Sequence, residues 1–216
     1  MKRVLVPAII LTIFAFVVAG EGQTNNDDNR KNEFGFTIGG EVIPDTSTKT
    51  TPPAPINIGS SIAYQLHYAH RLWKGDKAAL FFEVPAVAAP SHDVSSSNVA
   101  TPISLATFYV TPSFRLNLRP SARLSPWLSF GGGYGLYEGS ERLENGLTNF
   151  NRFSGTGALQ WGAGADFTTP FKIIFPISLR GEVRDFYTLD TLNFNNPLAR
   201  TTQHNVVAGG GFFWRF

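Results

Sequence analysis

The C-terminal stretch, residues 203–216, alternates between two kinds of side chain. It reads Gln-His-Asn-Val-Val-Ala-Gly-Gly-Gly-Phe-Phe-Trp-Arg-Phe. Counting back from the end in twos gives an apolar set that starts with Phe216, Trp214 and Phe212, whereas the other register is mostly small or polar. Because side chains alternate across a strand, this stretch predicts a β-strand with one apolar face that carries aromatic residues at its end. A soluble domain rarely exposes such a face, so we expect it to contact lipid.

The same alternation divides the rest of the chain into strands. Eight segments with period-two patterning cover residues 33–43, 57–72, 78–88, 103–118, 126–138, 155–169, 173–187 and 203–216. Their connections are alternately long and short, and the long ones span residues 44–56, 89–102, 139–154 and 188–202. Long outer loops and tight periplasmic turns are typical of outer-membrane barrels. The sequence therefore predicts an all-β fold, an eight-stranded antiparallel up-and-down transmembrane β-barrel.

Residues 1–20 have the pattern of a secretory signal peptide. Two basic residues precede the apolar run 4–18, and small residues follow it. The run is short for a membrane span and no stop-transfer pattern follows, although a retained anchor is the alternative. We expect residues 1–20 to be cleaved on export to the bacterial outer membrane. Residues 21–32 are then a flexible periplasmic tail, and residues 33–216 form the barrel domain.

Composition excludes several classes of protein. Without Lys2 and Arg3, the 18 basic residues fall to 16 and balance the 16 acidic ones. No basic run is interleaved with aromatic residues, so we expect no nucleic-acid partner. The chain has no cysteine, so disulfides do not hold it together. A mean hydropathy of −0.04 fits strands that are half apolar and excludes a bundle of apolar helices.

Alternation alone does not decide which face is inside. A soluble lipocalin-like ligand carrier also has eight alternating strands, but its interior is apolar. Here the non-apolar face is rich in Gly, Ser, Thr and Asn, which suit the crowded inside of a narrow barrel. Aromatic residues also lie near strand ends, as interfacial girdles require. We assign five of them to the girdles: Trp73, Trp127, Tyr137, Trp214 and Phe216.

Three prolines conflict with a simple closed barrel. Pro85, Pro112 and Pro176 fall within the third, fourth and seventh segments. Proline cannot donate a hydrogen bond to the ladder, and a closed barrel has no free edge to accommodate it. We therefore expect bulges or strand shifts at these positions.

The terminal Phe216 with Trp214 and Phe212, together with the loop alternation, resembles the small eight-stranded bacterial outer-membrane β-barrel family typified by the OmpA transmembrane domain and OmpX. The run 180–185 (Arg-Gly-Glu-Val-Arg-Asp) also resembles a stretch of such barrel domains. The resemblance implies that the terminal Phe is read by the barrel-insertion machinery. It also implies a porin-like monomer whose partners are outer-membrane lipids and a possible surface ligand at the extracellular loops.

Charged residues on the inward face are the main candidates for a site. They are Glu83, Arg115, Asp166, Arg180, Glu182 and Arg184. Burying such charges is costly unless they pair, so we expect an internal salt-bridge network. The network is either a plug that closes the lumen and fixes the strand register, or a gate or selectivity site of a narrow pore.

Other candidate sites are weaker. His92-Asp93 with Ser95, Ser96 and Ser97 could form a Ser/His/Asp set, but no nucleophile elbow surrounds these residues. His67 is expected to form hydrogen bonds in the lumen, and the four scattered histidines lack the spacing of metal ligands. Glycines 131–133 and 209–211 lack the following helix of a phosphate loop. We therefore expect no catalytic residue, cofactor or metal.

The sequence favours a structural or surface-interaction role without catalysis. Three alternatives stay open: a narrow channel for small solutes, a lipid A-modifying outer-membrane enzyme, and the soluble lipocalin-like carrier.

Overall fold

The computed structural model describes residues 30–47, 55–97, 100–169, 177–189 and 202–216. Residues Lys31–Arg215 form one compact unit, and a second unit contains residues 1–30 and Phe216. The first unit is an eleven-stranded sheet made of β1 Asn32–Val42, β2 Thr46–Ser47, β3 Pro55–Ile58, β4 Ser61–Lys74, β5 Ala78–Ser95, β6 Ser104–Val110, β7 Ser113–Leu118, β8 Leu124–Gly139, β9 Phe153–Thr168, β10 Ile177–Thr188 and β11 Gln203–Arg215. Among the described residues, no helix is long and apolar enough to cross a membrane.

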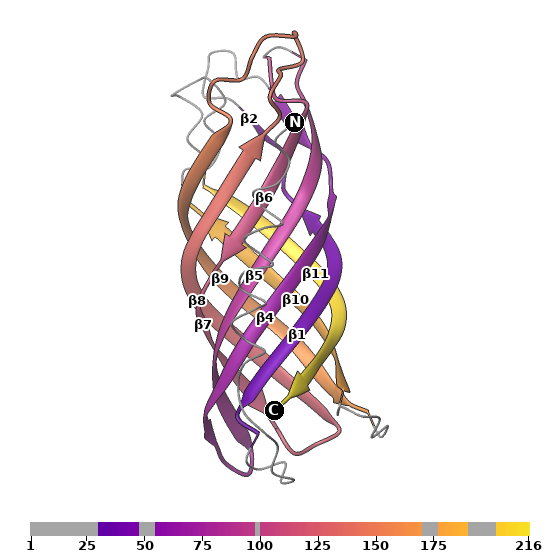
Figure 1. The fold of residues 1–216 in the computed structure, drawn as a ribbon, viewed down its shortest axis with the longest axis vertical. Coiled ribbons are helices and arrows are strands. Elements are labelled where there is room, and N and C mark those ends of the chain that lie inside the picture. Colours follow the sequence, from indigo (N-terminus) through magenta and orange to yellow (C-terminus); the bar gives the residue numbers. More distant parts are fainter. Residues whose placement is uncertain (1–29, 48–54, 98–99, 170–176, 190–201) are drawn as a thin grey trace. The chain divides into compact units, whose positions relative to one another are not determined.

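The sheet closes into a ring, because β1 pairs with β11 on one side and with β4 on the other (Figure 1). The order around the ring is β1, β4, β5, then β6 with β7, then β8, β9, β10 and β11, and every pairing is antiparallel. Strands β6 and β7 share one position, since both pair with β5 and with β8. The predicted eight-stranded antiparallel barrel is confirmed.

The two ends of the barrel differ in their connections. At the "turn end", β1 begins beside the last residues of β11, with Glu33 opposite Arg215. Here Gly75 N–H donates to the Ala78 carbonyl (2.8 Å) in the turn from β4 to β5. Arg119 adopts a φ of 53° in the turn from β7 to β8. The predicted turn at residues 170–176 lies outside the described residues, as do the predicted signal peptide and most of the tail.

At the opposite "loop end", several strands run further than the sequence predicted. Strand β5 continues to Ser95 rather than ending at Ala88, and β3 pairs with its upper part through Asn57 opposite Ser95. Parts of the predicted loops 44–56 and 89–102 are therefore strand. Residues 48–54, 98–99 and 190–201 lie outside the described residues.

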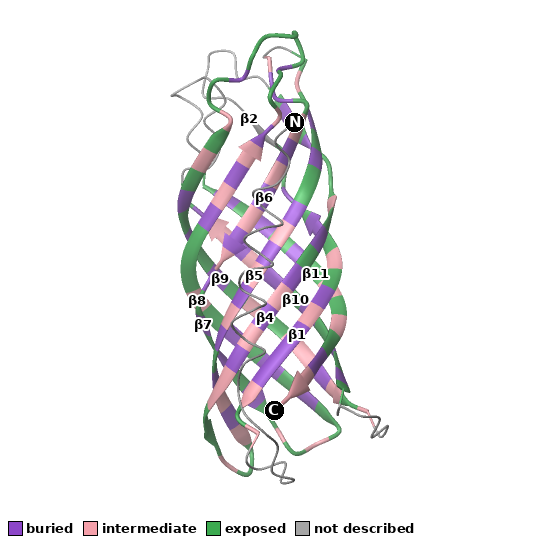
Figure 2. Cartoon of the chain, viewed as in Figure 1, coloured by how far each residue is buried: buried purple, intermediate pink, exposed green. Residues whose placement is uncertain are grey.

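The alternation of side chains determines what each face buries, and Figure 2 shows buried and exposed residues alternating along the strands. The outward face is apolar, with exposed side chains that include Ile38, Tyr64, Phe114, Leu128, Phe130 and Leu179. The charged residues of the predicted network are buried on the other face. This arrangement is the reverse of the polar exterior expected for a soluble carrier.

The strand interruptions follow two of the three prolines. Pro112 separates β6 from β7, and Pro85 lies in β5 between the residues that pair with β6 and those that pair with β7. Both carbonyls still accept hydrogen bonds, that of Pro85 from Thr111 N–H (3.3 Å) and that of Pro112 from Gly132 N–H (3.1 Å). The two residues without an N–H therefore face the same gap in the ladder. Pro176 lies outside the described residues.

The predicted girdle position of two aromatic residues is wrong. Trp127 and Tyr137 are 1% and 2% exposed and do not belong to an interfacial girdle; they share the inward parity of Ser129. The interior is also not polar throughout. Near the loop end, the described part of the chain contains a buried apolar cluster that includes Ile43, Ile56, Ile58, Val94 and Leu105. The sequence placed some of these in loops, because their strands extend beyond the length that a bilayer requires.

Candidate functional site

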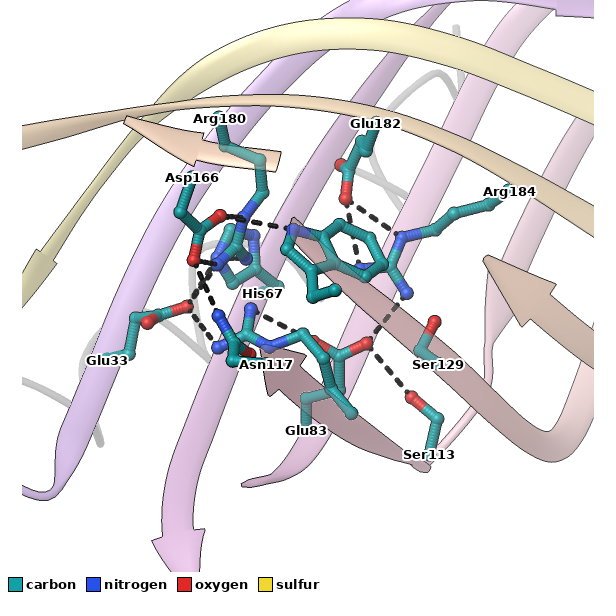
Figure 3. A network of polar contacts seen from close by, with 12 residues as sticks. Glu33, His67, Glu83, Ser113, Asn117, Ser129, Asp166, Arg180, Glu182 and Arg184 are labelled. Carbon is teal, nitrogen blue, oxygen red and sulfur yellow. Dashed lines mark hydrogen bonds and ion pairs between the residues drawn. The ribbon is translucent and has the colours of Figure 1, made fainter. Parts of the chain in front are cut away.

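All six charged residues predicted to face inward do so, and each is at most 6% exposed. They project from β5, β7, β9 and β10, and form one network in the half of the barrel nearer the turn end (Figure 3). We call this set the lumen network: Glu33, Glu83, Arg115, Asp166, Arg180, Glu182, Arg184 and Arg215, with His67 and Trp127 among them.

Arg180 connects three strands. Its Nε and Nη2 donate to the two oxygens of Asp166 at 2.7 and 2.9 Å, and Nη2 also donates to Glu33 Oε1 at 2.7 Å. Its Nη1 lies 2.8 Å from His67 Nε2. An arginine N–H can only donate, so His67 Nε2 accepts and the proton of this imidazole is on Nδ1. The predicted role of His67 as a hydrogen-bonding residue inside the barrel is confirmed.

Glu83 joins Arg184 and Arg115. Its Oε1 accepts a hydrogen bond from Arg184 Nη1 (2.8 Å), and its Oε2 lies 3.3 Å from Arg115 Nη1. Arg184 Nε donates in turn to Glu182 Oε2 at 3.1 Å, while Gln65 Nε2 donates to Glu182 Oε1 at 2.6 Å. Each of these carboxylates therefore has a donor from another strand, and the Arg184–Glu83 contact crosses the lumen from β10 to β5.

The indole of Trp127 lies among three guanidinium groups. The Arg184, Arg180 and Arg115 carbons lie 5.1, 5.4 and 5.8 Å from a Trp127 ring centroid. Its Nε1 donates to Asp166 Oδ1 at 3.1 Å. An indole attracts cations through its face and donates through its N–H, so Trp127 holds the arginines and the carboxylate together.

Glu33, like Arg215, belongs to the lumen network but was not predicted from the sequence. Its Oε1 accepts from Arg115 Nη2 at 2.7 Å as well as from Arg180, and its Oε2 accepts from Arg215 Nε at 3.2 Å. Glu33 is fully buried. The alternation places Glu33 on the face opposite to the outward Phe36, so the sequence could have shown that it points inward. Its pairing with Arg180 could not be predicted, because the two residues are 147 positions apart.

The charges of the lumen network balance. Four arginines (115, 180, 184 and 215) face four carboxylates (33, 83, 166 and 182). A buried charge without a partner costs several kcal/mol, so equal numbers are a condition for keeping this set inside a narrow barrel.

Glycines make room for the larger members of the network. A Cβ on Gly35 would lie 2.2 Å from His67 Cε1, and a Cβ on Gly164 would lie 2.5 Å from the Trp127 ring. These two residues lie opposite the bulky side chains in their ladders, Gly35 opposite His67 and Gly164 opposite Trp127. The absence of a side chain at each position lets a ring lie flat over the neighbouring strand.

A second polar cluster lies nearer the loop end, centred on Glu41. This carboxylate accepts hydrogen bonds from the hydroxyls of Thr107 (2.6 Å) and Tyr109 (2.9 Å), and it lies 3.3 Å from His92 Nε2. The other nitrogen of His92 lies 2.8 Å from the carbonyl of Gly59. His92 therefore connects β1 to the chain between β3 and β4. The sequence did not assign Glu41 to a site.

The Ser/His/Asp set is not assembled. His92 is buried against Glu41, whereas the next residue, Asp93, is exposed on the opposite face of β5. Ser96 Oγ donates to the carbonyl of Pro55 instead of contacting an imidazole. In the described part of the chain, no group of three His, Cys, Asp or Glu side chains is arranged to hold a metal.

Two residues of the proposed insertion signature, Phe212 and Trp214, lie on the outward face of β11, and Phe216 follows the end of that strand. The rings of Phe212 and Phe36 are 6.0 Å apart, and those of Trp214 and Phe34 are 4.8 Å apart. These cross-strand aromatic pairs fasten the last strand to the first, which is where the ring closes. Recognition of Phe216 by insertion machinery stays a prediction.

No family model and no curated protein sequence matches the chain. Among solved structures it is similar to the outer membrane protein OprG from Pseudomonas aeruginosa, with a TM-score of 0.54 at 15% identity over 87% of this chain and 97% of that one. It is also similar to Neisserial surface protein A, with a TM-score of 0.52 at 10% identity over 86% of this chain and 96% of that one. The TM-scores and coverages show a shared fold, that of small outer-membrane barrels, and at these low identities they show the fold alone. The closer resemblance to OmpA and OmpX stays a prediction.

Proposed function

We propose that this protein is a closed, non-conducting β-barrel of a bacterial outer membrane that carries extracellular segments for surface interaction. The turn end faces the periplasm and the loop end faces outward. The barrel acts without catalysis, as a monomer, and its apolar outer face contacts lipid. The shared fold supports the membrane location, and the apolar residues exposed on the outward face support the contact with lipid.

The lumen network carries the proposal. Three of its ion pairs, Arg115–Glu33, Arg180–Glu33 and Arg184–Glu83, join strands that are not neighbours in the ring, and others join neighbouring strands or residues of β10. The paired side chains other than Arg215 are at most 3% exposed. A path for ions or solutes would require these pairs to separate, which leaves buried charges without partners. We therefore favour the plug over the gate.

The loop end supports the surface role. Strands β5, β8 and β9 contain 18, 16 and 16 residues, whereas about 9–11 are enough to span a bilayer when tilted. The excess lies on the loop side, where residues 140–152 connect β8 to β9. There Ser140 and Glu144 donate backbone hydrogen bonds to the carbonyls of Ser104 and Thr101, and Phe150 is 88% exposed. A barrel that only closed itself in the membrane would not need this extension.

Conductance across a planar lipid bilayer tests the proposal. The protein is first shown to be a folded barrel by the shift in its gel mobility between unheated and boiled samples. We then expect no steady conductance from the wild type. A variant with Glu83→Ser, Arg115→Ser and Arg184→Ser removes charges of both signs from the centre of the lumen, and we expect steady open-channel currents from it.

The matched control is Ser154→Ala with Thr156→Ala, which changes small polar side chains of β9 above the lumen network. It should stay silent in the same membrane. Steady currents from the heat-shiftable wild type would overturn the plug and favour the narrow channel. A wild type that shows no heat shift and stays in the soluble fraction would overturn the membrane location itself.

A further inference from the structure

On the outward face of the barrel, a carboxylate and an imidazole lie beside two aromatic rings. Asp185 of β10 and His204 of β11 are joined by a 2.8 Å contact between Oδ2 and Nδ1. The ring of Tyr187 lies 4.9 Å from that of His204 and 6.3 Å from that of Trp161, and Trp161 contacts His204 at 5.8 Å. We call these four residues the Asp185 cluster.

Asp185 is unusual for its position. It continues the outward face of β10 after Ile177, Leu179 and Val183, which are 41%, 49% and 50% exposed. A carboxylate on a lipid-facing strand is costly in the hydrocarbon region and tolerated near the interface. Its level on the barrel therefore decides what surrounds it.

The strand geometry gives this level. Ile177 lies at the turn end, opposite Trp214. Asp185 follows eight positions later, which is about 20 Å along the membrane normal for a rise of about 3.3 Å per residue and a tilt of about 40°. The apolar band of such barrels is about 25 Å tall. Asp185 and the next outward residue, Tyr187, are thus at the outer boundary of the band, where lipid headgroups begin.

The cluster also leaves hydrogen-bonding capacity unused. The Asp185 side chain is 18% exposed and holds the His204 imidazole through Oδ2, while its Oδ1 is covered from solvent. The His204 side chain is 51% exposed, and its Nδ1 is already engaged, so its Nε2 remains for a partner outside the protein. An exposed imidazole nitrogen beside aromatic faces matches a hydroxyl or amino group and the apolar face of a sugar ring.

We propose that the Asp185 cluster binds a sugar of a glycolipid headgroup in the outer leaflet, with His204 Nε2 hydrogen-bonded to the sugar, Asp185 orienting the imidazole, and Trp161 and Tyr187 packed against the sugar ring. A glycolipid fits better than a free sugar, because the cluster adjoins the apolar band that would hold the acyl chains. The inference rests on the proposed membrane location. It is independent of whether the lumen conducts.

Lipid retention tests the site. The full protein is reconstituted in lipid discs that contain phosphatidylethanolamine with or without lipid A, a glycolipid with an amino-sugar headgroup. Bound lipids are counted by native mass spectrometry, and free glucosamine is added in a third arm. We expect the wild type to retain lipid A in preference to the phospholipid, and glucosamine without acyl chains not to displace it.

His204→Gln should lower the retention of lipid A about tenfold, the change expected for one lost hydrogen bond. Asp185→Asn removes the charge that orients the imidazole and should lower retention in the same direction. His70→Gln is the matched control: His70 is a partly buried outward-face histidine bonded to Asn32 near the turn end. It should retain lipid A as the wild type does. Trp161→Leu keeps an apolar surface and should also weaken retention, so the test stands even if one polar variant fails to fold.

Equal retention of lipid A by the heat-shiftable wild type and its folded variants would overturn the site and leave the proposed barrel intact. The pair would then be an interfacial contact satisfied by water. Displacement by free glucosamine would overturn the glycolipid assignment. A wild type without the heat shift would overturn both the membrane location and this inference.

Discussion

Arg180 contacts both carboxylate oxygens of Asp166, which is its direct partner in the ladder between β10 and β9. Asp166 also accepts hydrogen bonds from Trp127 Nε1 (3.1 Å) and Asn117 Nδ2 (3.0 Å). One carboxylate therefore connects donors from β7, β8 and β10. Because forked, charge-assisted pairs are among the stronger polar contacts, this pair is the part of the lumen network most sensitive to substitution.

Asp166→Asn keeps the size of the side chain but removes its charge. Arg180 is then compensated less completely in the interior, and breaking a buried pair costs about 3–5 kcal/mol. We expect the free energy of unfolding to fall by about this amount, as measured by urea unfolding in lipid vesicles followed by tryptophan fluorescence. Asp93→Asn, at an exposed position, should shift it by less than about 0.5 kcal/mol. Equal shifts for the two variants would contradict the central place of Asp166.

Gly35→Ala should destabilise the barrel through clashes with two side chains, the His67 imidazole (2.2 Å) and Phe213 Cβ (2.8 Å). The new methyl group would overlap the His67 imidazole, which itself bonds Arg180, and overpacking of this kind costs about 1–3 kcal/mol. Gly157→Ala is the control, because nothing lies within 4 Å of its added Cβ. In the double variant with His67→Ala, the alanine at position 35 should cost less than it does alone. A double-mutant cycle with no coupling would argue against the packing of His67 over Gly35.

The tryptophans report directly on which face is inside. A variant that retains Trp127 alone should resist quenching by lipids brominated on their acyl chains, because the indole is 1% exposed inside the barrel. The wild type should be quenched, since Trp161 is 39% exposed on the outward face, and Trp161→Phe should reduce that effect. Strong quenching of Trp127 would restore the girdle position predicted from the sequence.

Pro85 and Pro112 lie where β5 passes from pairing with β6 to pairing with β7, so no ladder hydrogen bond requires an N–H at these positions. Pro112→Ala should therefore keep the shift in gel mobility on heating and change the free energy of unfolding by less than about 1 kcal/mol. Leu116→Pro, only four positions further, removes a donor from a residue paired with both Leu80 and Leu128. We expect this variant to lose the folded, heat-shiftable band. If both variants kept or both lost the folded band, the interruption between β6 and β7 would not be what accommodates the prolines.

The Glu41 cluster can be tested through one hydroxyl. Tyr109→Phe removes a buried donor to Glu41 and should lower stability by about 1–3 kcal/mol. Tyr64→Phe changes a tyrosine that is 42% exposed on the outward face and should have little effect. A smaller loss for Tyr109→Phe than for Tyr64→Phe would contradict a structural role of the cluster.

The sequence was informative wherever a local pattern had one geometric consequence. The parity of Arg180, Glu182 and Arg184 placed all three inside, as the structure has them. The alternation also indicates that Trp127 points inward, because it lies on the same face of β8 as Ser129. The girdle prediction failed there because it relied on closeness to a strand end rather than on alternation. Strand ends were less certain, since side chains in extended loops alternate as well.

Period-two alternation, the order of long and short connections, and the aromatic C-terminal strand together determined the closed antiparallel barrel and the identity of its inner face. These follow from backbone geometry, which acts over neighbouring residues. Only the tertiary structure decided that Glu33 joins Arg180, that Glu41 meets His92, and that Asp185 lies beside His204. Such contacts depend on ring closure and on the tilt of the strands, which bring residues from different strands to the same place and which no local pattern in the chain records.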